Sequence, residues 1–195
     1  MEKYISKKEK ASYGFAAVGS YMVAGITQSY LMYFFTDILI IPSAFVMMLM
    51  IVARVWDALN DPMMGVIVDR TSTKYGKMRP YVLVGSFLML VTTIVLFMPL
   101  TGAPTMFKMI FAAVSYIIFG MAYTLTDVPA MGLMSVATPN GDERASLLSF
   151  YVTVGSVGSL LPVGLLTIFQ SFIPEKYVYF AMSIFVGIIT SAEIG

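Results

Sequence analysis

A cluster of polar residues interrupts an apolar stretch of the sequence. Arg54, Asp57, Asn60 and Asp61 lie between residues 47–52 and 63–68, two runs without any charged residue. If this stretch is helical, the cluster lies within or near the hydrocarbon region of a membrane, where a charge costs roughly 2.5–3.5 kcal/mol on insertion scales. Charged residues at that depth usually face a cavity or a pathway, so the cluster is the first candidate for a functional site.

The spacing of the cluster suits the binding of a cation. Residues four apart share a face of a helix, so Asp57 and Asp61 lie one turn apart, with Asn60 on nearly the same side. Hard cations such as Na⁺ take oxygen ligands of this kind. Two neighbouring carboxylates also repel each other and can share a proton instead. Pro62 removes a backbone donor and can free a carbonyl as a further ligand. The pattern therefore predicts a site for Na⁺ or H⁺ and leaves the choice open.

A structural alternative is that Arg54 neutralises Asp57 in a buried ion pair. One Arg balances only one of the two carboxylates, so an acid is left over, which favours the functional interpretation. Trp56 is expected to point elsewhere on the helix, as packing or as an interfacial anchor.

A second acid, Asp127, lies in the apolar segment 107–138. Thr124 precedes it by three residues and shares its face of a helix. This pair can meet the first cluster across a bundle, bind a polar solute, or make a structural hydrogen bond to another helix. In the first apolar segment the polar residues mark either a water-lined face or helix packing; they are Ser20, Tyr21, Thr27, Gln28 and Tyr30.

The composition is that of an all-α integral membrane protein. Of the 195 residues, 58% are hydrophobic and 12% charged, and the mean hydropathy is +0.84, whereas soluble domains are roughly 25% charged. The chain has no Cys and no His, which excludes disulfides, thiol chemistry and zinc-type sites. Its net charge of +1, without a clustered basic face, argues against nucleic acid as a partner.

Six apolar segments are long enough to span a bilayer, for which about 20 residues suffice. They cover residues 12–36, 43–68, 81–100, 107–138, 145–172 and 177–194. Most Lys and Arg residues fall on one side of these spans, and only Lys108 and Lys176 fall on the other. The positive-inside rule then predicts a multi-pass protein of the cell inner membrane with both termini cytoplasmic. Residues 1–11 form a cytoplasmic tail and residues 12–195 a six-helix bundle.

Two sets of motifs resemble a known transporter family. The spacing of Gly65, Asp69, Arg70, Gly76, Lys77 and Arg79 resembles the loop between the second and third helices of the major facilitator superfamily. More closely, residues 56–62, 12–15, 33–37 and 124–129 resemble the glycoside-pentoside-hexuronide:cation symporters, the family of melibiose permease. We assign structural or gating roles to Arg54, Asp69, Arg70, Gly76 and Arg79.

The resemblance implies both a fold and a function. The fold is the N-terminal half of a twelve-helix transporter, built as two three-helix inverted repeats over about residues 12–100 and 107–195. The function is the symport of a sugar, glycoside or related polar solute with Na⁺, Li⁺ or H⁺, without another cofactor. The partners implied are the solute, the cation, the lipid bilayer, and a missing C-terminal half or a second copy. On this basis the chain is expected to be a fragment, a truncated product or a dimerising half-transporter that does not transport alone.

The resemblance also implies which residues bind. The cation site uses Asp57, Asn60 and Asp61, which would be the metal ligands for Na⁺, with Thr124 contributing. The solute site involves Asp127, to which we add Tyr21 and Gln28 from the first helix. Melibiose permease has an Asp where this chain has Tyr21 and an Arg where it has Val152, and these departures argue against a galactoside.

Two other classes of function are weighed against symport. An intramembrane aspartyl protease also needs two membrane carboxylates, but it brings them together from two helices, and this sequence has no Gly-x-Gly-Asp stretch. A non-transporting scaffold or truncated half-transporter is the remaining alternative. The sequence therefore predicts a transporter and not an enzyme.

Overall fold

The computed structural model describes residues 5–74 and 76–192. Every regular element in this part of the chain is a helix. Short connections join α1 (Lys7–Tyr33), the π-helical turn η1 (Phe34–Ile38), α2 (Ser43–Arg70), α3 (Arg79–Leu96), α4 (Thr105–Val136), α5 (Gly141–Gln170) and α6 (Glu175–Ala192). The predicted all-α class is confirmed.

Four of these helices, α2, α3, α4 and α5, are long and apolar enough to cross a membrane. Polar residues such as Gln28 dilute the hydropathy of α1, and the short α6 begins with Glu175 and Lys176. A count of six spans therefore stays a prediction.

The helix ends follow local signals that the sequence carries. Helix α1 begins at Lys7, five residues before the expected span, because Ser6 caps it. The Ser6 Oγ accepts a hydrogen bond from the Glu9 backbone N–H at 3.2 Å, and the Ser6 backbone N–H donates to the Glu9 carboxylate at 2.8 Å. These two bonds hold the pKa of Glu9 below its ordinary value. The Asn140 side chain caps α5 in the predicted turn, whereas α3 ends at Leu96, earlier than the expected Leu100.

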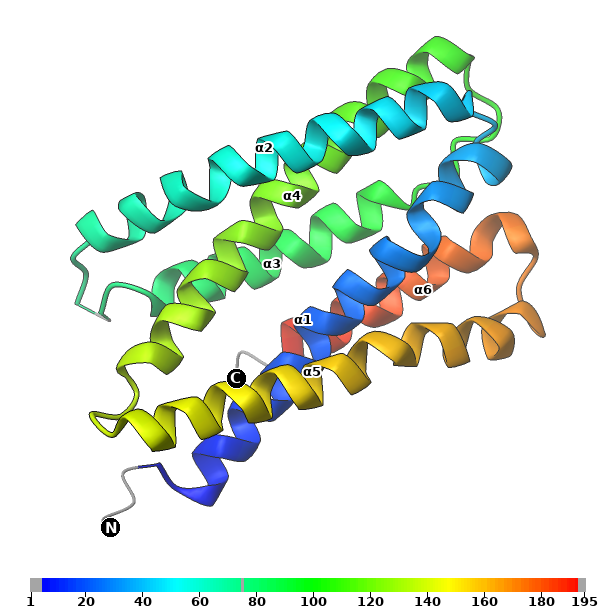
Figure 1. Cartoon of the computed structure of the whole chain (residues 1–195). Coiled ribbons are helices and arrows are strands. Elements are labelled where there is room, and N and C mark those ends of the chain that lie inside the picture. Colours follow the sequence, from blue (N-terminus) through cyan, green and yellow to red (C-terminus); the bar gives the residue numbers. More distant parts are fainter. Residues whose placement is uncertain (1–4, 75, 193–195) are drawn as a thin grey trace.

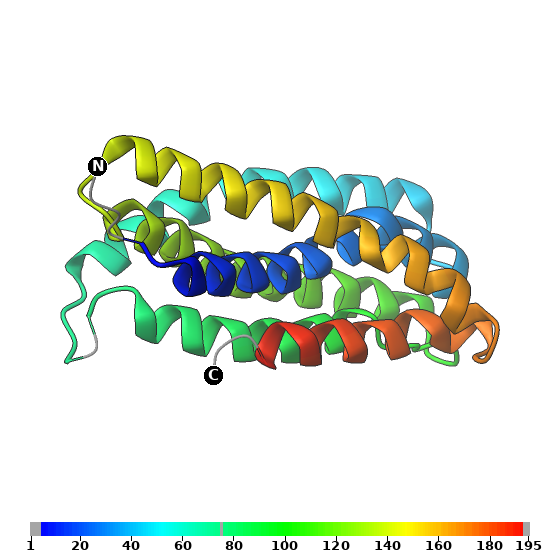
Figure 2. The same ribbon diagram turned by 90° about the horizontal axis from the view of Figure 1, so that it is seen from below.

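The helices form three stacked pairs along one long axis (Figures 1 and 2). In Figure 2, α2 and α5 form one outer layer, α1 and α4 the middle layer, and α3 and α6 the other outer layer. The packing is reciprocal, because α1 packs on α5 and α6 while α4 packs on α2 and α3. If α1–α3 and α4–α6 are two three-helix units, the first helix of each unit packs on the last two helices of the other.

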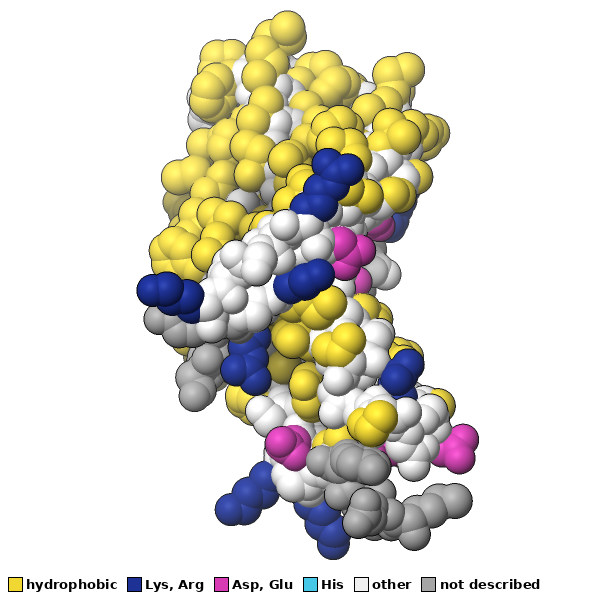
Figure 3. Space-filling model, turned by 90° about the vertical axis from the view of Figure 1, so that its left-hand side faces the viewer, with side chains coloured by type: hydrophobic (Ala, Val, Ile, Leu, Met, Phe, Trp, Pro, Cys, Tyr) yellow, Lys and Arg dark blue, Asp and Glu magenta, His cyan; other side chains and the backbone are white. Residues whose placement is uncertain are grey.

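The two ends of the bundle differ in charge. At one end, here called the basic end, Lys and Arg side chains gather (Figure 3). Eight of the described cations belong to the segments that meet there: Lys7, Lys8, Lys10, Arg70, Lys74, Lys77, Arg79 and Arg144. At the opposite end, the buried ammonium of Lys108 donates a hydrogen bond to the Leu39 carbonyl at 2.9 Å. This bond ties the start of α4 to the chain that leaves η1.

Glycines allow α1 and α5 to approach each other closely. A Cβ added at Gly25 would lie 2.2 Å from the carbonyl oxygen of Ser159, and one added at Gly158 would lie 2.8 Å from that of Val18. By contrast, a Cβ added at Gly164 of α5 would meet no atom within 4 Å. Close packing of α5 on α1 thus depends on Gly158 and not on Gly164.

We predict that Gly25→Ala lowers the free energy of unfolding by about 1–3 kcal/mol, because the new methyl group must push two helix backbones apart. Detergent-induced unfolding in mixed micelles, followed by circular dichroism, measures this change. Gly164→Ala is the matched control and should leave the unfolding midpoint unchanged. Equal effects of the two substitutions would contradict close packing at Gly25.

Candidate functional site

A cavity of about 200 Å³ lies where α1, α2 and α4 meet. Its walls include Asp57 and Asp61 of α2, Thr124 of α4, and Thr27 and Gln28 of α1. We call it the acidic cavity. The structure therefore brings two of the predicted cation ligands on α2 together with the predicted ligand on α4.

A hydrogen bond links the two helices at this cavity. The Thr124 hydroxyl donates to Asp61 Oδ1 at 2.8 Å across the α2–α4 interface. The bond fixes one oxygen of Asp61 and leaves the lone pairs of the Thr124 oxygen available to a ligand. Carboxylate and hydroxyl oxygens are thus held side by side at the α2–α4 contact.

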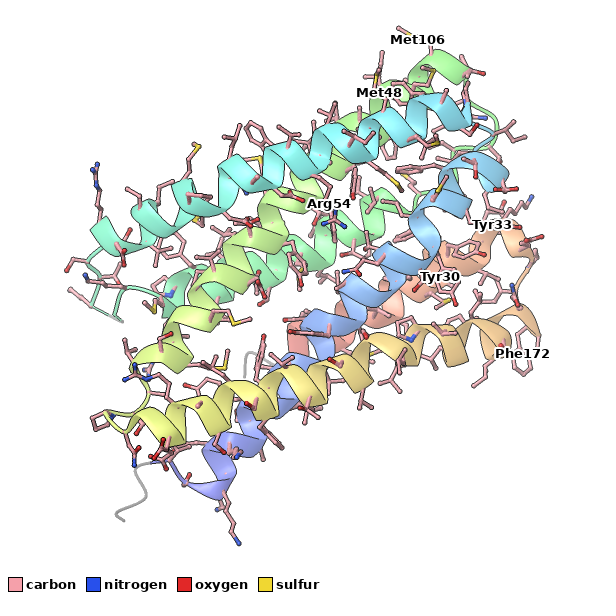
Figure 4. The ribbon with its side chains drawn as sticks, in the orientation of Figure 1. Tyr30, Tyr33, Met48, Arg54, Met106 and Phe172 are labelled. Atoms are coloured by element: carbon pink, nitrogen blue, oxygen red, sulfur yellow. The ribbon has the colours of Figure 1, made fainter. Side chains whose placement is uncertain are left out.

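Asp57 lies against Gly120 of α4, a residue that has no side chain. A Cβ added at Gly120 of α4 would lie only 3.1 Å from Asp57 Oδ1. Arg54 lies 3.9 Å from Asp57, but its side chain is 71% exposed and that of Asp57 is 34% exposed. Figure 4 shows Arg54 extending from α2 toward α1. The pair is therefore long and accessible in this chain, unlike the buried structural pair weighed from the sequence.

Two neighbours of the acids differ from expectation. Trp56 lines the acidic cavity instead of facing away from it, and its indole nitrogen is buried without a hydrogen-bond partner among the described residues. Asn60 is only 7% exposed, and its Nδ2 likewise has no partner there. Asn60 is not among the residues that line the cavity, so its role as a cation ligand stays a prediction.

A second cavity, of about 420 Å³, lies between α1, α4 and α5, and we call it the Asp127 cavity. It brings together the three residues predicted to bind solute, Asp127, Tyr21 and Gln28. Ser156 and Ser159 of α5 add hydroxyl groups to its wall. No hydrogen bond to Asp127 from another helix is found within the described part of the chain, so the predicted structural alternative has no support there.

The two cavities share a wall. Ala24, Gln28 and Tyr123 line both of them, and Tyr123 lies within electrostatic range of both Asp61 and Asp127. Thr124 and Asp127, which the sequence grouped on one face, open instead into different cavities. Because three residues line both cavities, a ligand in one cavity would lie close to a ligand in the other.

The loop-motif residues lie away from both cavities, at the basic end. Gly76 has a φ of +92°, a left-handed conformation that favours glycine. The Lys77 ammonium donates to the Asp69 carbonyl at 3.1 Å and so satisfies one carbonyl at the end of α2. Arg70 ends that helix and Arg79 begins α3. Their predicted gating roles are not tested by this geometry.

The acidic cavity offers oxygen ligands of the kind that a small monovalent cation takes. Helix α2 runs through Pro62 without interruption, and because proline has no N–H, the Ala58 carbonyl lacks its usual donor. Ala58 lies in the same turn of α2 as Asp57 and Asp61, although it is not among the residues that line the cavity. Within the described residues, no group of three or more Asp, Glu, His or Cys side chains could hold a metal ion.

Sequence reasoning missed three residues of the site. Tyr123 forms the shared wall, Gly120 makes room for Asp57, and Trp56 lines the acidic cavity. The position of Gly120 one turn before Thr124 was the available signal, because residues four apart share a helix face. Nothing in the spacing distinguished Tyr123 or Trp56 from a packing aromatic.

Comparisons with known proteins agree on one family. A family model described as MFS/sugar transport protein matches residues 12–193. The uncharacterized symporter YjmB of Bacillus subtilis strain 168 is 36% identical over 161 residues, which are 82% of this chain and 35% of that protein. The inner membrane symporter YicJ of Escherichia coli K12 is 34% identical, over 80% of this chain and 34% of that protein. The isoprimeverose transporter of Lactiplantibacillus pentosus is 30% identical, over 78% and 32%. The chain spans about a third of the length of these curated relatives.

We predict that Gly120→Ala weakens the Na⁺ binding expected in the acidic cavity by about two- to threefold, because the added methyl group must shift the Asp57 carboxylate by a few tenths of an ångström. Trp56 is the only tryptophan of the sequence and lines this cavity, so its fluorescence during a Na⁺ titration reports binding. Gly65→Ala is the control, since a Cβ there would meet nothing within 4 Å. An unchanged Na⁺ affinity in Gly120→Ala would show that the position of the Asp57 carboxylate does not depend on the absence of a side chain at residue 120.

Proposed function

Because the chain belongs to the MFS/sugar transport protein family, we propose that it forms the N-terminal half of a cation-coupled symporter. The proposed cargo is a sugar, a glycoside or a related small polar solute, and the coupling ion is Na⁺, Li⁺ or H⁺. The proposed fold is a bundle of six membrane spans made of two inverted three-helix repeats, which the reciprocal packing of α1 and α4 supports.

Family membership makes the chain a multi-pass membrane protein of a transporter family and not an enzyme, as the sequence predicted. The intramembrane protease alternative is therefore wrong. The names of the relatives as symporters and transporters give no support to a non-transporting scaffold.

The hydrogen bond between Thr124 and Asp61 is the observation that carries the proposal. It holds oxygen ligands from two helices at one cavity, so a cation bound there would cross-link α2 and α4. Asp57, Asp61 and Thr124 would bind the cation, with Asn60 and the Ala58 carbonyl as further oxygen ligands. Two carboxylates that lie one turn apart repel each other, and a cation or a proton between them relieves that repulsion.

The wall shared by the two cavities gives the proposed coupling its physical basis. Asp127, Tyr21 and Gln28 would hydrogen-bond the hydroxyl groups of a solute, with Ser156 and Ser159 opposite them. A cation in the acidic cavity would fix α2 against α4 and so position Tyr123 and Gln28, which also face the solute. Each ligand would then favour the helix arrangement that the other requires.

Orientation and assembly complete the proposal. The basic end would face the cytoplasm, by the positive-inside rule, with both termini there and the bundle in the cell inner membrane. In transporters of this architecture the solute site lies between two bundles. The second bundle would be a C-terminal half or a second copy of this chain.

We predict that Asp57→Asn and Asp61→Asn abolish Na⁺ binding, because each removes a charge that a monovalent cation needs. Thr124→Val should weaken binding about tenfold, since it removes the hydroxyl and keeps the shape. The quenching or enhancement of Trp56 fluorescence by Na⁺ measures both effects. Asp142→Asn, at the basic end, is the control, because it changes the charge by the same amount away from both cavities. Wild-type affinity in the Asp57 and Asp61 variants would refute the cation site, and competition between Na⁺ and low pH would identify H⁺ as an alternative ion.

A separate experiment tests the need for a second bundle. Proteoliposomes that contain only this chain are expected to show no Na⁺-driven uptake of a labelled glycoside above empty liposomes. The Na⁺ response of Trp56 should persist in the same vesicles, which shows that the bundle is folded. Gradient-driven uptake by the chain alone would contradict this part of the proposal and leave the cation site standing.

A further inference from the structure

A third cavity, of about 380 Å³, lies at the basic end of the bundle and has a different chemistry. It fills the space between α1 and the first turns of α3, and α4, α5 and α6 close its inner side. We call it the Arg79 cavity. It is distinct from the Asp127 cavity, because the edge-to-face pair Tyr21–Tyr151, with ring centroids 5.9 Å apart, lies between them: Tyr21 lines the Asp127 cavity and Tyr151 the Arg79 cavity.

The charge of this cavity is positive, unlike that of the other two. Arg79 is the one charged residue among those that line it. In the described part of the chain, no Asp or Glu oxygen lies within the 4 Å of an ion pair with the Arg79 guanidinium. Arg79 is also the first residue of α3, an 18-residue helix whose positive dipole end points to the same place. An anion is the ligand that this mouth would attract.

Hydroxyl groups lie among the apolar side chains that line most of the cavity. Ser86 and Thr126 donate their protons to backbone carbonyls of their own helices, at 2.8 Å and 3.2 Å. Their oxygens therefore present free lone pairs to whatever fills the cavity. Ser12, Tyr13 and Ser20 of α1 face them across it. Hydroxyl groups of a ligand would find acceptors here, and the aliphatic side chains that also line the cavity would contact its carbon atoms.

We propose that the Arg79 cavity binds an organic phosphate that carries hydroxyl groups, with the phosphate on Arg79 and the hydroxylated part against Ser86 and Thr126. A guanidinium pairs with phosphate through two parallel hydrogen bonds. The volume of about 380 Å³ falls within the range of small-molecule sites. Glycerol phosphate is the shared chemical unit of two sources, a free metabolite and the headgroup of an anionic phospholipid.

Two measurements on the purified 195-residue chain test this proposal and distinguish the sources. Equilibrium dialysis with labelled glycerol 3-phosphate, in a neutral detergent, measures binding of the free compound. Native mass spectrometry after reconstitution into nanodiscs of phosphatidylglycerol and phosphatidylcholine measures selective retention of the anionic lipid. We expect at least one of the two measurements to show one molecule of glycerol 3-phosphate or of phosphatidylglycerol bound per chain.

Matched variants separate a built site from general attraction to a basic surface. Arg79→Gln should lower binding at least about tenfold, and Thr126→Val, which keeps the side-chain shape, several-fold. Lys74→Gln removes the same charge from the same end without touching the cavity and should change nothing. Circular dichroism checks that each variant is folded. Absence of binding in both measurements, or equal losses in Arg79→Gln and Lys74→Gln, would overturn the proposal.

Discussion

Three carboxylates on otherwise apolar helices are the constraint on which the rest of this structure depends. Charged groups at membrane depth need a cavity or a partner, and Asp57, Asp61 and Asp127 each line a cavity. The helices must therefore leave space around these acids and still pack tightly elsewhere. Glycine reconciles the two demands, because Gly120 makes room for a carboxylate while Gly25 and Gly158 bring α1 and α5 into backbone contact.

The bundle also sorts its charges along its length. Asp57, Asp61 and Asp127 line two of the cavities, whereas eight of the described cations gather at the basic end, where Arg79 gives a third cavity the opposite sign. Ligands of opposite charge would thus be attracted to different places in the same half-bundle. The two regions meet at the Tyr21–Tyr151 pair, which belongs to one cavity on each side.

Helix α4 is the element that the proposed cation and the proposed solute would share. Thr124 contacts Asp61 on one side of this helix, Asp127 faces another cavity, and Tyr123 contributes to the wall between them. A helix that contributes to two cavities would couple them without any long pathway, because a shift of one rigid element would change both. This is the kind of two-site element that energetic coupling requires.

The sequence alone determined the class of the protein, the approximate helix ends, the family motifs and the identity of the three acids. Apolar length, capping residues and the cost of a membrane charge are local properties, so they can be read along the chain. Only the tertiary structure decided that Thr124 bonds to Asp61 while Asp127 shares a cavity with Tyr21 and Gln28. Residues three apart on a helix point about 60° away from each other, so which neighbour each one meets depends on the helices packed around α4. Sequence spacing grouped Thr124 with Asp127 for that reason, and the packing of α1, α2 and α5 around α4 separated them.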